Sequence, residues 1–377
     1  VGHKIGGPGK VSVVASGLFG SISGSAIANT VSTGAFTIPM MKKAGFRPHV
    51  AGGIEPAASI GGMFMPPIMG AGGFIMAELT GVPYSEIMLV AIFPALMYFF
   101  SVFMMVHYEA KKHNIVGERS AVSAMDIIRR EWFYILPLVA ITIFMLAGYS
   151  PGYSAILGVL TCIGVSWIRV DTRIGLKGFL RASRAGAESS LKIGATVGVI
   201  GIIIGVLTYS GLVLTFADIV IELAGGSLVL TILFIALASL VLGMGVPVTA
   251  AYLITAVVAV PALVHLGVNE IAAHMIVYWL SQDSNITPPV CIAAFAGATI
   301  AKANMWKTAF TSFKFAKFLY LGPFLFGYVP GFSLNGSAWD IIKAFVLILI
   351  GTYAYSWFLS GIWFKPLKGM FKKAPAS

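Results

Sequence analysis

Hydrophobic residues in this chain form long, nearly unbroken stretches instead of the short periodic runs of a soluble domain. A stretch that approaches about 20 residues predicts a membrane-spanning α-helix, since that length crosses the bilayer core. Helices are expected because a chain in lipid must satisfy its own backbone hydrogen bonds. The uninterrupted stretches cover residues 86–107, 133–148, 151–168, 193–212, 313–332 and 339–362. The pattern therefore predicts an all-α integral membrane protein.

Other apolar stretches are interrupted near their middles by Gly, Ser, Asn or Pro. Segment 10–41 is broken at Ser21–Ser25, segment 49–78 at Gly61–Pro67, segment 226–266 at Gly243–Pro247, and segment 271–301 at Asn285–Pro289. Irregular backbone survives at membrane depth only where protein buries it or where it lines a polar cavity. We therefore expect these four breaks to meet at one cavity near the bilayer midplane.

The breaks recur along the chain at a fixed offset of 222 residues. The offset relates Pro39 to Pro261, Gly45 to Gly267, and Pro66-Pro67 to Pro288-Pro289. Matching interruptions in two halves of an apolar chain are the best sequence indication of a transporter's binding site. The offset therefore predicts a duplicated chain with its site between the copies.

Composition supports this interpretation. Hydrophobic residues make up 58% of the chain and charged residues only 10%, against about 25% charged residues in soluble domains. The net charge of +11 does not indicate nucleic-acid binding, because Lys and Arg cluster between the apolar stretches, as in cytoplasmic loops. The two cysteines lie in apolar segments, so we expect neither a disulfide framework nor a Cys-based metal site. No phosphate-binding loop or metalloprotease motif indicates an enzyme, and no cofactor beyond a coupling ion is expected.

The charged flanks predict the side from which each broken stretch enters the membrane. Lys10 and Lys42 flank segment 10–41, so both of its ends are expected in the cytoplasm and the segment forms a re-entrant hairpin. No Lys or Arg flanks segment 226–266, which we expect to enter from outside as a second hairpin. Five spans separate the hairpins, and an odd number inverts the second copy. The basic residues after 362 place the C-terminus in the cytoplasm.

These features divide the chain into two inverted copies and their connections. Residues 1–110 form the first copy, with hairpin 1, a broken helix and a helix. Residues 111–225 hold scaffold helices and a cytoplasmic amphipathic segment at 169–192. Residues 226–332 form the second copy, and residues 333–377 hold a final transmembrane helix and the basic tail.

The breaks supply the candidate binding groups. Half-helix N-termini present free N–H groups to an anion, and carbonyl, hydroxyl and amide oxygens suit a cation such as Na⁺. The candidate substrate-binding residues are Ser21, Ser23, Ser25, Asn29, Thr249 and Asn285. The candidate Na⁺ ligands are Ser23, Ser25, Gly62, Met65, Gly243, Gly245, Thr249, Asn285 and Thr287. Small residues also permit close helix packing, which remains the simpler interpretation for any one of them.

Two carboxylates lie within the broken helices. Asp283 lies five residues before the second Pro-Pro pair, and Glu55 lies inside the first broken helix. A carboxylate at membrane depth is costly unless it faces protein interior or water, so both are candidates for cation or proton coupling. The alternative for each is a structural carboxylate hydrogen-bonded to neighbouring helices.

Several of these segments resemble a known transporter family. Ala15–Ala26 resembles the first hairpin of the large membrane subunit of TRAP (tripartite ATP-independent periplasmic) transporters. Leu242–Gly245 and Thr249–Tyr252 resemble its second hairpin, and Ile286–Val290 resembles the broken helix that follows. Val106–Lys112 and Met65–Pro67 are most similar to the fused type, in which the small and large subunits form one chain. The resemblance covers nearly the whole chain.

The resemblance implies an elevator-type secondary transporter that imports an organic acid with Na⁺ or H⁺. It implies a multi-pass protein of the inner membrane and two partners, an extracytoplasmic TAXI-class substrate-binding protein and a small membrane subunit. It also implies that the small subunit and the first helices of the large one precede this sequence. Met63 departs from the pattern, since related chains carry Gln there. A divalent-anion/sodium symporter that needs no binding protein is the nearest alternative, and an uncoupled channel is another.

Overall fold

The computed structural model describes residues 2, 4–117 and 124–362. Over these residues it consists of helices joined by turns and loops, with one isolated bridge between Ile5 and Val116 and no strand. The first half contains α1 (Gly7–Ser23), α2 (Ala26–Lys43), α3 (Pro48–Gly61), the short η1 (Gly62–Phe64), α4 (Gly70–Thr80) and α5 (Tyr84–His113). Helices α1 and α2 pack together as hairpin 1. Helices α3 and α4 are the halves of the first broken helix.

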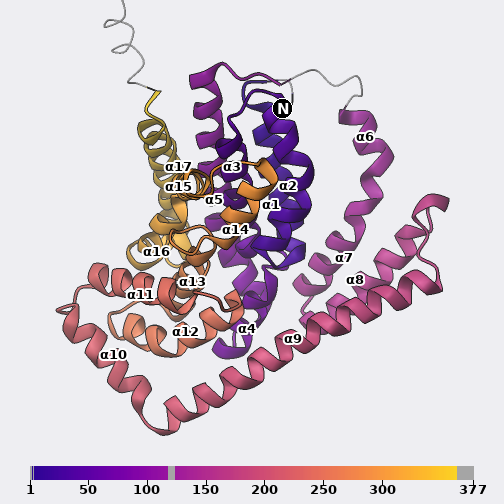
Figure 1. The fold of residues 1–377 in the computed structure, drawn as a ribbon. Coiled ribbons are helices and arrows are strands. Elements are labelled where there is room, and N and C mark those ends of the chain that lie inside the picture. The colour runs from indigo at the N-terminus through magenta and orange to yellow at the C-terminus, as the bar shows by residue number, and fades with distance from the viewer. Residues whose placement is uncertain (1, 3, 118–123, 363–377) are drawn as a thin grey trace, which may run out of the picture.

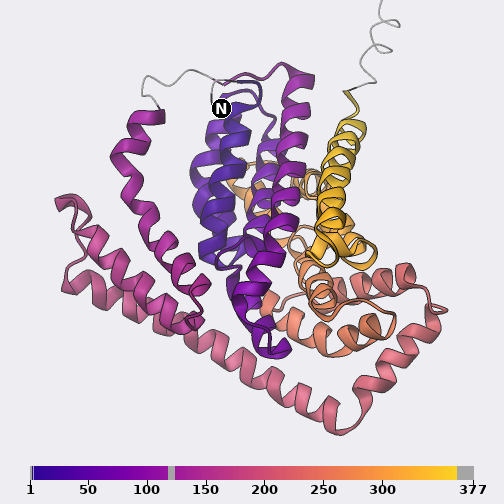
Figure 2. The same ribbon diagram turned by 180° about the vertical axis from the view of Figure 1, so that it is seen from behind.

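The middle of the chain leads away from this bundle and back. It contains α6 (Ala124–Glu131), η2 (Trp132–Ile135), α7 (Leu136–Leu146), α8 (Pro151–Ser166), η3 (Val170–Thr172), α9 (Leu176–Tyr209) and α10 (Leu212–Leu223). Figures 1 and 2 show α6–α8 beside the bundle and α9 running along one edge of the molecule from α8 to α10.

The second half returns to the bundle. It contains α11 (Leu228–Leu242), α12 (Val248–His265), α13 (Glu270–Leu280), η4 (Asp283–Asn285), α14 (Ile292–Ala301), α15 (Met305–Phe315), α16 (Phe318–Tyr328), η5 (Pro330–Ser333) and α17 (Ala338–Ser360). Helices α11 and α12 form hairpin 2, and α13 and α14 are the halves of the second broken helix.

The 222-residue offset seen in the sequence also relates the helices. Moving α2 by this offset gives the bounds of α12. The offset also relates two turns, since Gly45 and Gly267 have φ angles of 105° and 87°. Met69 and Cys291, which precede the second halves of the broken helices, both have left-handed backbones with φ of 55° and 32°. Because these conformations are uncommon outside Gly, their recurrence supports a structural duplication. Both Pro-Pro peptide bonds are cis.

Aromatic side chains join the two broken helices in the buried core. The rings of Phe64 and Trp279 stack with their centroids 4.3 Å apart, and Tyr98 of α5 packs edge-on against Phe64 at 5.0 Å. All of these side chains are buried. Such aromatic pairs add about 0.5–1.5 kcal/mol beyond area burial, so they help to hold the breaks side by side.

Three predicted spans differ from the observed helices. The amphipathic segment 169–192 and the span 193–212 were expected as separate elements, but α9 runs from Leu176 to Tyr209 across the boundary between them, since no Pro interrupts it. The span 313–332 is divided between α15 and α16. The span 133–148 begins with the turn η2, and α7 starts at Leu136 with Pro137 in its first turn, where Pro is tolerated because its missing N–H has no helical partner.

Within the described residues, four helices are long and apolar enough to cross a membrane: α5, α9, α12 and α17. The shorter helices come mainly from the breaks, which divide longer apolar stretches. The protein is therefore an all-helical chain with several apolar helices, as an integral membrane protein requires.

Candidate functional site

A cavity of about 470 Å³ lies where the four predicted breaks come together. Its walls come from both hairpins, both broken helices and α9. The lining residues are Gly24, Ser25, Ala26, Ile27, Met63, Ala71, Ile193, Gly243, Gly245, Val246, Pro247, Val248, Thr249, Ser284, Asn285 and Ile292. The expectation that the breaks share one cavity is confirmed.

The cavity also gathers the starts of several helices. Ala26, Val248 and Ile292 are the first residues of α2, α12 and α14, and Ala71 is the second residue of α4. The first turn of a helix has backbone N–H groups without helical partners and carries a partial positive charge. Four such ends meet around this cavity, and no Lys or Arg is among its lining residues. Helix N-termini in this arrangement can bind an anion chemically.

The tip of hairpin 1 brings one predicted hydroxyl to the cavity. Ser25 is the N-cap of α2, and its Oγ accepts a hydrogen bond from the N–H of Ala28 at 3.2 Å. Ser23 ends α1 beside it, half-buried, with its hydroxyl 3.5 Å from the carbonyl of Ser25. Gly24 allows the turn, since it has a φ of 62°. The tip therefore brings the Ser25 hydroxyl and the N-terminus of α2 to the cavity, whereas Ser23 is not among the lining residues.

Two other predicted residues of hairpin 1 point elsewhere. Ser21 donates to the carbonyl of Leu18 at 2.9 Å. Asn29 is fully buried, and its amide donates to the carbonyls of Ser16 at 2.8 Å and Ser59 at 3.3 Å. The structure does not bring either side chain to the cavity, because the rotational position of each on its helix turns it inward.

The tip of hairpin 2 lies against the second broken helix. Gly243 leaves no room for a side chain, since a Cβ there would lie 2.6 Å from Ser284 Oγ. Gly245 has a φ of 85°, which favours Gly, and Thr249 lies in the first turn of α12. Gly243, Gly245 and Thr249 all line the cavity together with Ser284 and Asn285. The second tip and the break that faces it therefore form one wall.

A second group of polar atoms in the same broken helix is buried without partners. Among the described residues, Asp283 Oδ1 and both polar atoms of the Gln282 amide have no hydrogen-bond partner. Asp283 is only 3% exposed. The hydroxyls of Thr287 and Tyr320 lie 2.5 Å apart. Buried polar groups are normally paired, so the unpaired oxygens of Gln282 and Asp283 are available to a cation.

Carbonyls of the first broken helix are bound by tyrosines. The hydroxyl of Tyr278 lies 2.8 Å from the Met63 carbonyl and 2.6 Å from the Met69 carbonyl. The hydroxyl of Tyr84 lies 2.9 Å from the Pro67 carbonyl and 2.7 Å from that of Ile68. These tyrosines supply donors that the interrupted helix lacks, and no sequence pattern indicated them.

Replacing Tyr278 with Phe is expected to destabilise the protein by about 1–3 kcal/mol, because it removes the one hydroxyl donor that two buried carbonyls at the break share. The ring, which packs against Gly72, is retained. Thermal unfolding of the purified protein in detergent measures the effect. Tyr153→Phe is the control, since that side chain is half exposed on α8; equal melting temperatures for both variants would contradict the assignment.

The remaining predicted ligands in this region lie outside the cavity. Gly62 packs directly on Gly20, where a Cβ would lie 2.4 Å from the Gly20 Cα. Its carbonyl accepts from the Met65 N–H at 3.3 Å. Met65 instead lines an apolar pocket between α1 and α5. Met63, where a polar contact was not expected, lies on the cavity wall.

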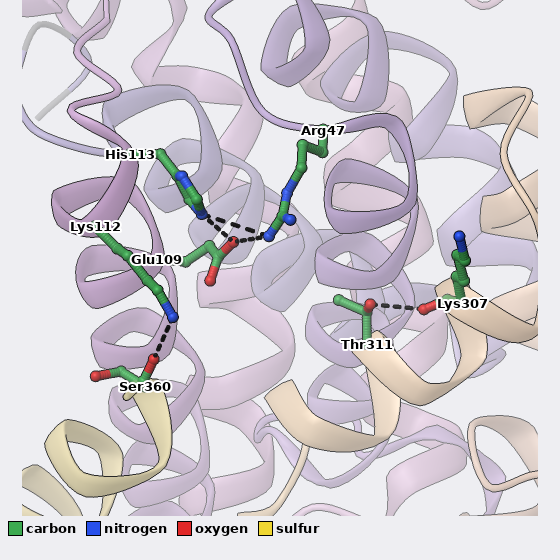
Figure 3. Close-up of polar contacts among 7 residues, drawn as sticks. All are labelled: Arg47, Glu109, Lys112, His113, Lys307, Thr311 and Ser360. Carbon is green, nitrogen blue, oxygen red and sulfur yellow. Dashed lines mark hydrogen bonds and ion pairs between the residues drawn. The ribbon is translucent and has the colours of Figure 1, made fainter. Parts of the chain in front are cut away.

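One end of the bundle carries a cluster of charged residues (Figure 3). Arg47, before α3, pairs with Glu109 of α5 at 2.9 Å, and His113 Nε2 lies 3.4 Å from the same carboxylate oxygen. Lys112 donates to the carbonyl of Ser360 at the end of α17 at 3.4 Å. These contacts join α5 to α3 and α17, far along the sequence from one another.

Comparison with known proteins identifies the chain's relatives. The family model described as "Tripartite ATP-independent periplasmic transporter, DctM component" matches residues 1–332. The 2,3-diketo-L-gulonate TRAP transporter large permease protein YiaN of Escherichia coli is 22% identical over 342 residues, covering 90% of this chain and 80% of that protein.

Two sialic acid transporters are similar as well. The sialic acid TRAP transporter large permease protein SiaM of Vibrio cholerae is 23% identical over 304 residues, covering 78% of this chain and 69% of that protein. The sialic acid TRAP transporter permease protein SiaT of Haemophilus influenzae is 24% identical over 315 residues, covering 81% of this chain and 49% of that protein.

Proposed function

The chain belongs to the DctM family of tripartite ATP-independent periplasmic transporters, and on this premise we propose that it is a permease that imports an organic acid together with Na⁺. The relatives from Escherichia coli, Haemophilus influenzae and Vibrio cholerae are named as transporters of 2,3-diketo-L-gulonate and of sialic acid. Both compounds are carboxylic acids. The proposed substrate class for this chain is therefore a carboxylate.

The observation that carries the proposal is the convergence of four helix N-termini on one cavity. A carboxylate in this cavity would accept hydrogen bonds from free backbone N–H groups and from the hydroxyls of Ser25 and Thr249. Asn285 and Ser284 complete the polar wall. Because the positive ends of helices supply the charge, the site does not need a basic side chain.

Na⁺ would occupy oxygen-rich places beside the substrate. The proposed ligands are the hydroxyls and carbonyls at the two tips and the oxygens of the second break. The unpaired Asp283 Oδ1 provides a negative charge for the ion, since burying a carboxylate without a counter-charge is costly. Transport of Na⁺ down its gradient would supply the energy for uptake.

The proposed mechanism is an elevator with re-entrant hairpins. The hairpins and broken helices pack against one another around the cavity, whereas α6 and α8 make few contacts with them. The packed group would move across the membrane as a unit while the outer helices stay in place. We place the protein in the inner membrane with its C-terminus in the cytoplasm.

Two partners complete the proposal. The family is described as tripartite and periplasmic, so an extracytoplasmic binding protein, of the TAXI class, would deliver the substrate. A small membrane subunit would be the other component.

Uptake by proteoliposomes tests the function. Sialic acid and 2,3-diketo-L-gulonate serve as labelled probes, with and without a purified extracytoplasmic binding protein of the TAXI class. We expect uptake only with the binding protein and an inward Na⁺ gradient. Uptake without any binding protein would favour a divalent-anion/sodium symporter, and ion currents without a gradient-coupled flux would indicate a channel; either result would overturn the proposal.

A further inference from the structure

Glu55 of α3 is completely buried among hydroxyl groups from both arms of hairpin 1. Ser12 and Ser16 of α1 donate to its two carboxylate oxygens. Thr33 and Thr37 of α2 donate to the same two oxygens, Thr37 at 2.5 Å. The carboxylate is 0% exposed. The Glu55 side chain therefore holds α1 and α2 of hairpin 1 against α3.

These contacts favour a structural role for Glu55 over ion coupling. An ionised carboxylate can only accept hydrogen bonds, and four hydroxyl donors occupy its acceptor positions. The hydroxyl oxygens contact the carboxylate directly, which leaves no space for a cation between them. Asn29 adds to the same junction, since its amide donates to carbonyls of α1 and α3.

Hairpin 2 lacks this junction. At the 222-residue offset, Val277 stands in place of Glu55, Ala259 in place of Thr37, and Thr255 in place of Thr33. Thr255 is buried, and its hydroxyl has no hydrogen-bond partner among the described residues. The turn of hairpin 2 is also more exposed, since Met244–Pro247 are all exposed whereas Ser23–Ser25 of hairpin 1 are half-buried. One buried hydrogen bond, between the Tyr252 hydroxyl and His274 Nδ1 at 2.8 Å, joins α12 to α13 instead. Four hydroxyl contacts to a single carboxylate therefore hold hairpin 1 to its broken helix, and among the described residues the equivalent place in hairpin 2 has no such group.

We propose that Glu55 is a positioning residue for transport: it holds hairpin 1 as a fixed wall of the cavity, so that hairpin 2 opens and closes it. The residue does not touch the cavity, and it acts through the position of Ser23 and Ser25 at the tip. This inference rests on the proposed function, because it assigns roles to the two hairpins of the same site.

Cysteine labelling tests the difference between the hairpins. The exposed Cys162 is replaced by Ser, and one reporter cysteine is introduced, either at tip 1 by Ser23→Cys or at tip 2 by Val246→Cys. A membrane-permeant maleimide then measures how accessible each reporter is in the full chain, with 100 mM Na⁺ or choline. We expect Na⁺ to slow labelling of the tip 2 reporter at least about tenfold and to leave that of the tip 1 reporter within about twofold.

Matched Thr-to-Val substitutions test the junction itself. Thr33→Val removes one donor to Glu55, whereas Thr255→Val at the equivalent place in hairpin 2 removes a hydroxyl with no partner among the described residues. We expect Thr33→Val to raise labelling of the tip 1 reporter at least about fivefold and to raise the Na⁺ concentration for half-maximal uptake. Thr255→Val should change neither quantity.

Glu55→Gln separates positioning from proton transfer. The amide of Gln can still form hydrogen bonds with the hydroxyls. We therefore expect the tip 1 reporter in Glu55→Gln to be labelled at a rate between the rates in the parent and in Glu55→Ala. Uptake by Glu55→Gln should keep the parent's pH profile. Loss of pH dependence in Glu55→Gln would overturn the proposal and assign coupling to Glu55. Equal effects of Thr33→Val and Thr255→Val would also overturn it. If Na⁺ changes the labelling rate of neither reporter while Thr33→Val still increases labelling of the tip 1 reporter, the result contradicts the proposed Na⁺ site and supports the anchoring role of Glu55.

Discussion

Gly243→Ala is expected to reduce uptake on the order of 100-fold, the effect that a displacement of about 1 Å can have at a precisely arranged site. The added Cβ would lie 2.6 Å from Ser284 Oγ and 2.9 Å from the carbonyl of Ser239. The backbone of Gly243 has a φ of −73°, which Ala adopts freely. The effect would therefore be steric, because the tip of hairpin 2 must move away from η4.

The measurement is initial uptake by proteoliposomes at saturating Na⁺, with the amount of folded protein determined by gel filtration. Gly201→Ala is the matched control, because a Cβ on Gly201 of α9 meets no atom within 4 Å. We expect the control to transport like the parent. Parental uptake by Gly243→Ala would show that the contact between tip 2 and Ser284 is not needed for transport.

Asp283→Asn is expected to raise the Na⁺ concentration for half-maximal uptake about 100-fold, which corresponds to about 2.7 kcal/mol of binding free energy. The substitution keeps the shape of the side chain and removes its charge. Because Asp283 Oδ1 is buried without a hydrogen-bond partner among the described residues, a bound cation is the proposed counter-charge. The loss of that attraction should weaken Na⁺ binding more than substrate binding.

Uptake as a function of Na⁺ concentration, together with the charge moved per substrate, measures this effect. Asp218→Asn on α10 removes a carboxylate that is exposed and away from the cavity, and should leave both quantities unchanged. Parental stoichiometry and Na⁺ dependence in Asp283→Asn would rule out a coupling role for this residue.

Local features of the sequence were sufficient to predict where the helices are interrupted. Pro and Gly act on the backbone where they stand, so the interruptions at Pro66-Pro67 and Gly243 could be located without knowing their surroundings. The lengths of apolar stretches likewise predicted the hairpins and the helix pairs around the breaks. The division of the span 313–332 into two helices was missed, since no Pro or Gly lies beside Ala316 and Lys317, where α15 gives way to α16.

The sequence alone did not predict the direction in which each side chain points. Asn29 and Ser25 both lie at the tip of hairpin 1 in the sequence, but a helix turns successive residues to different faces, so only Ser25 reaches the cavity. Glu55 was a candidate for coupling because carboxylates are costly in membranes. Its four hydroxyl partners come from two other helices, and they favour anchoring instead.

By itself, the sequence determined that this is an all-helical membrane protein whose apolar stretches are interrupted at matching places, because hydrophobic length and backbone restriction are local properties. Only the tertiary structure decided which broken ends share the cavity and which groups satisfy them. Tyr278, 215 residues from the Met63 carbonyl that it binds, shows the reason. A hydrogen bond needs two groups within about 3 Å, and only packing of the whole chain brings such distant residues together.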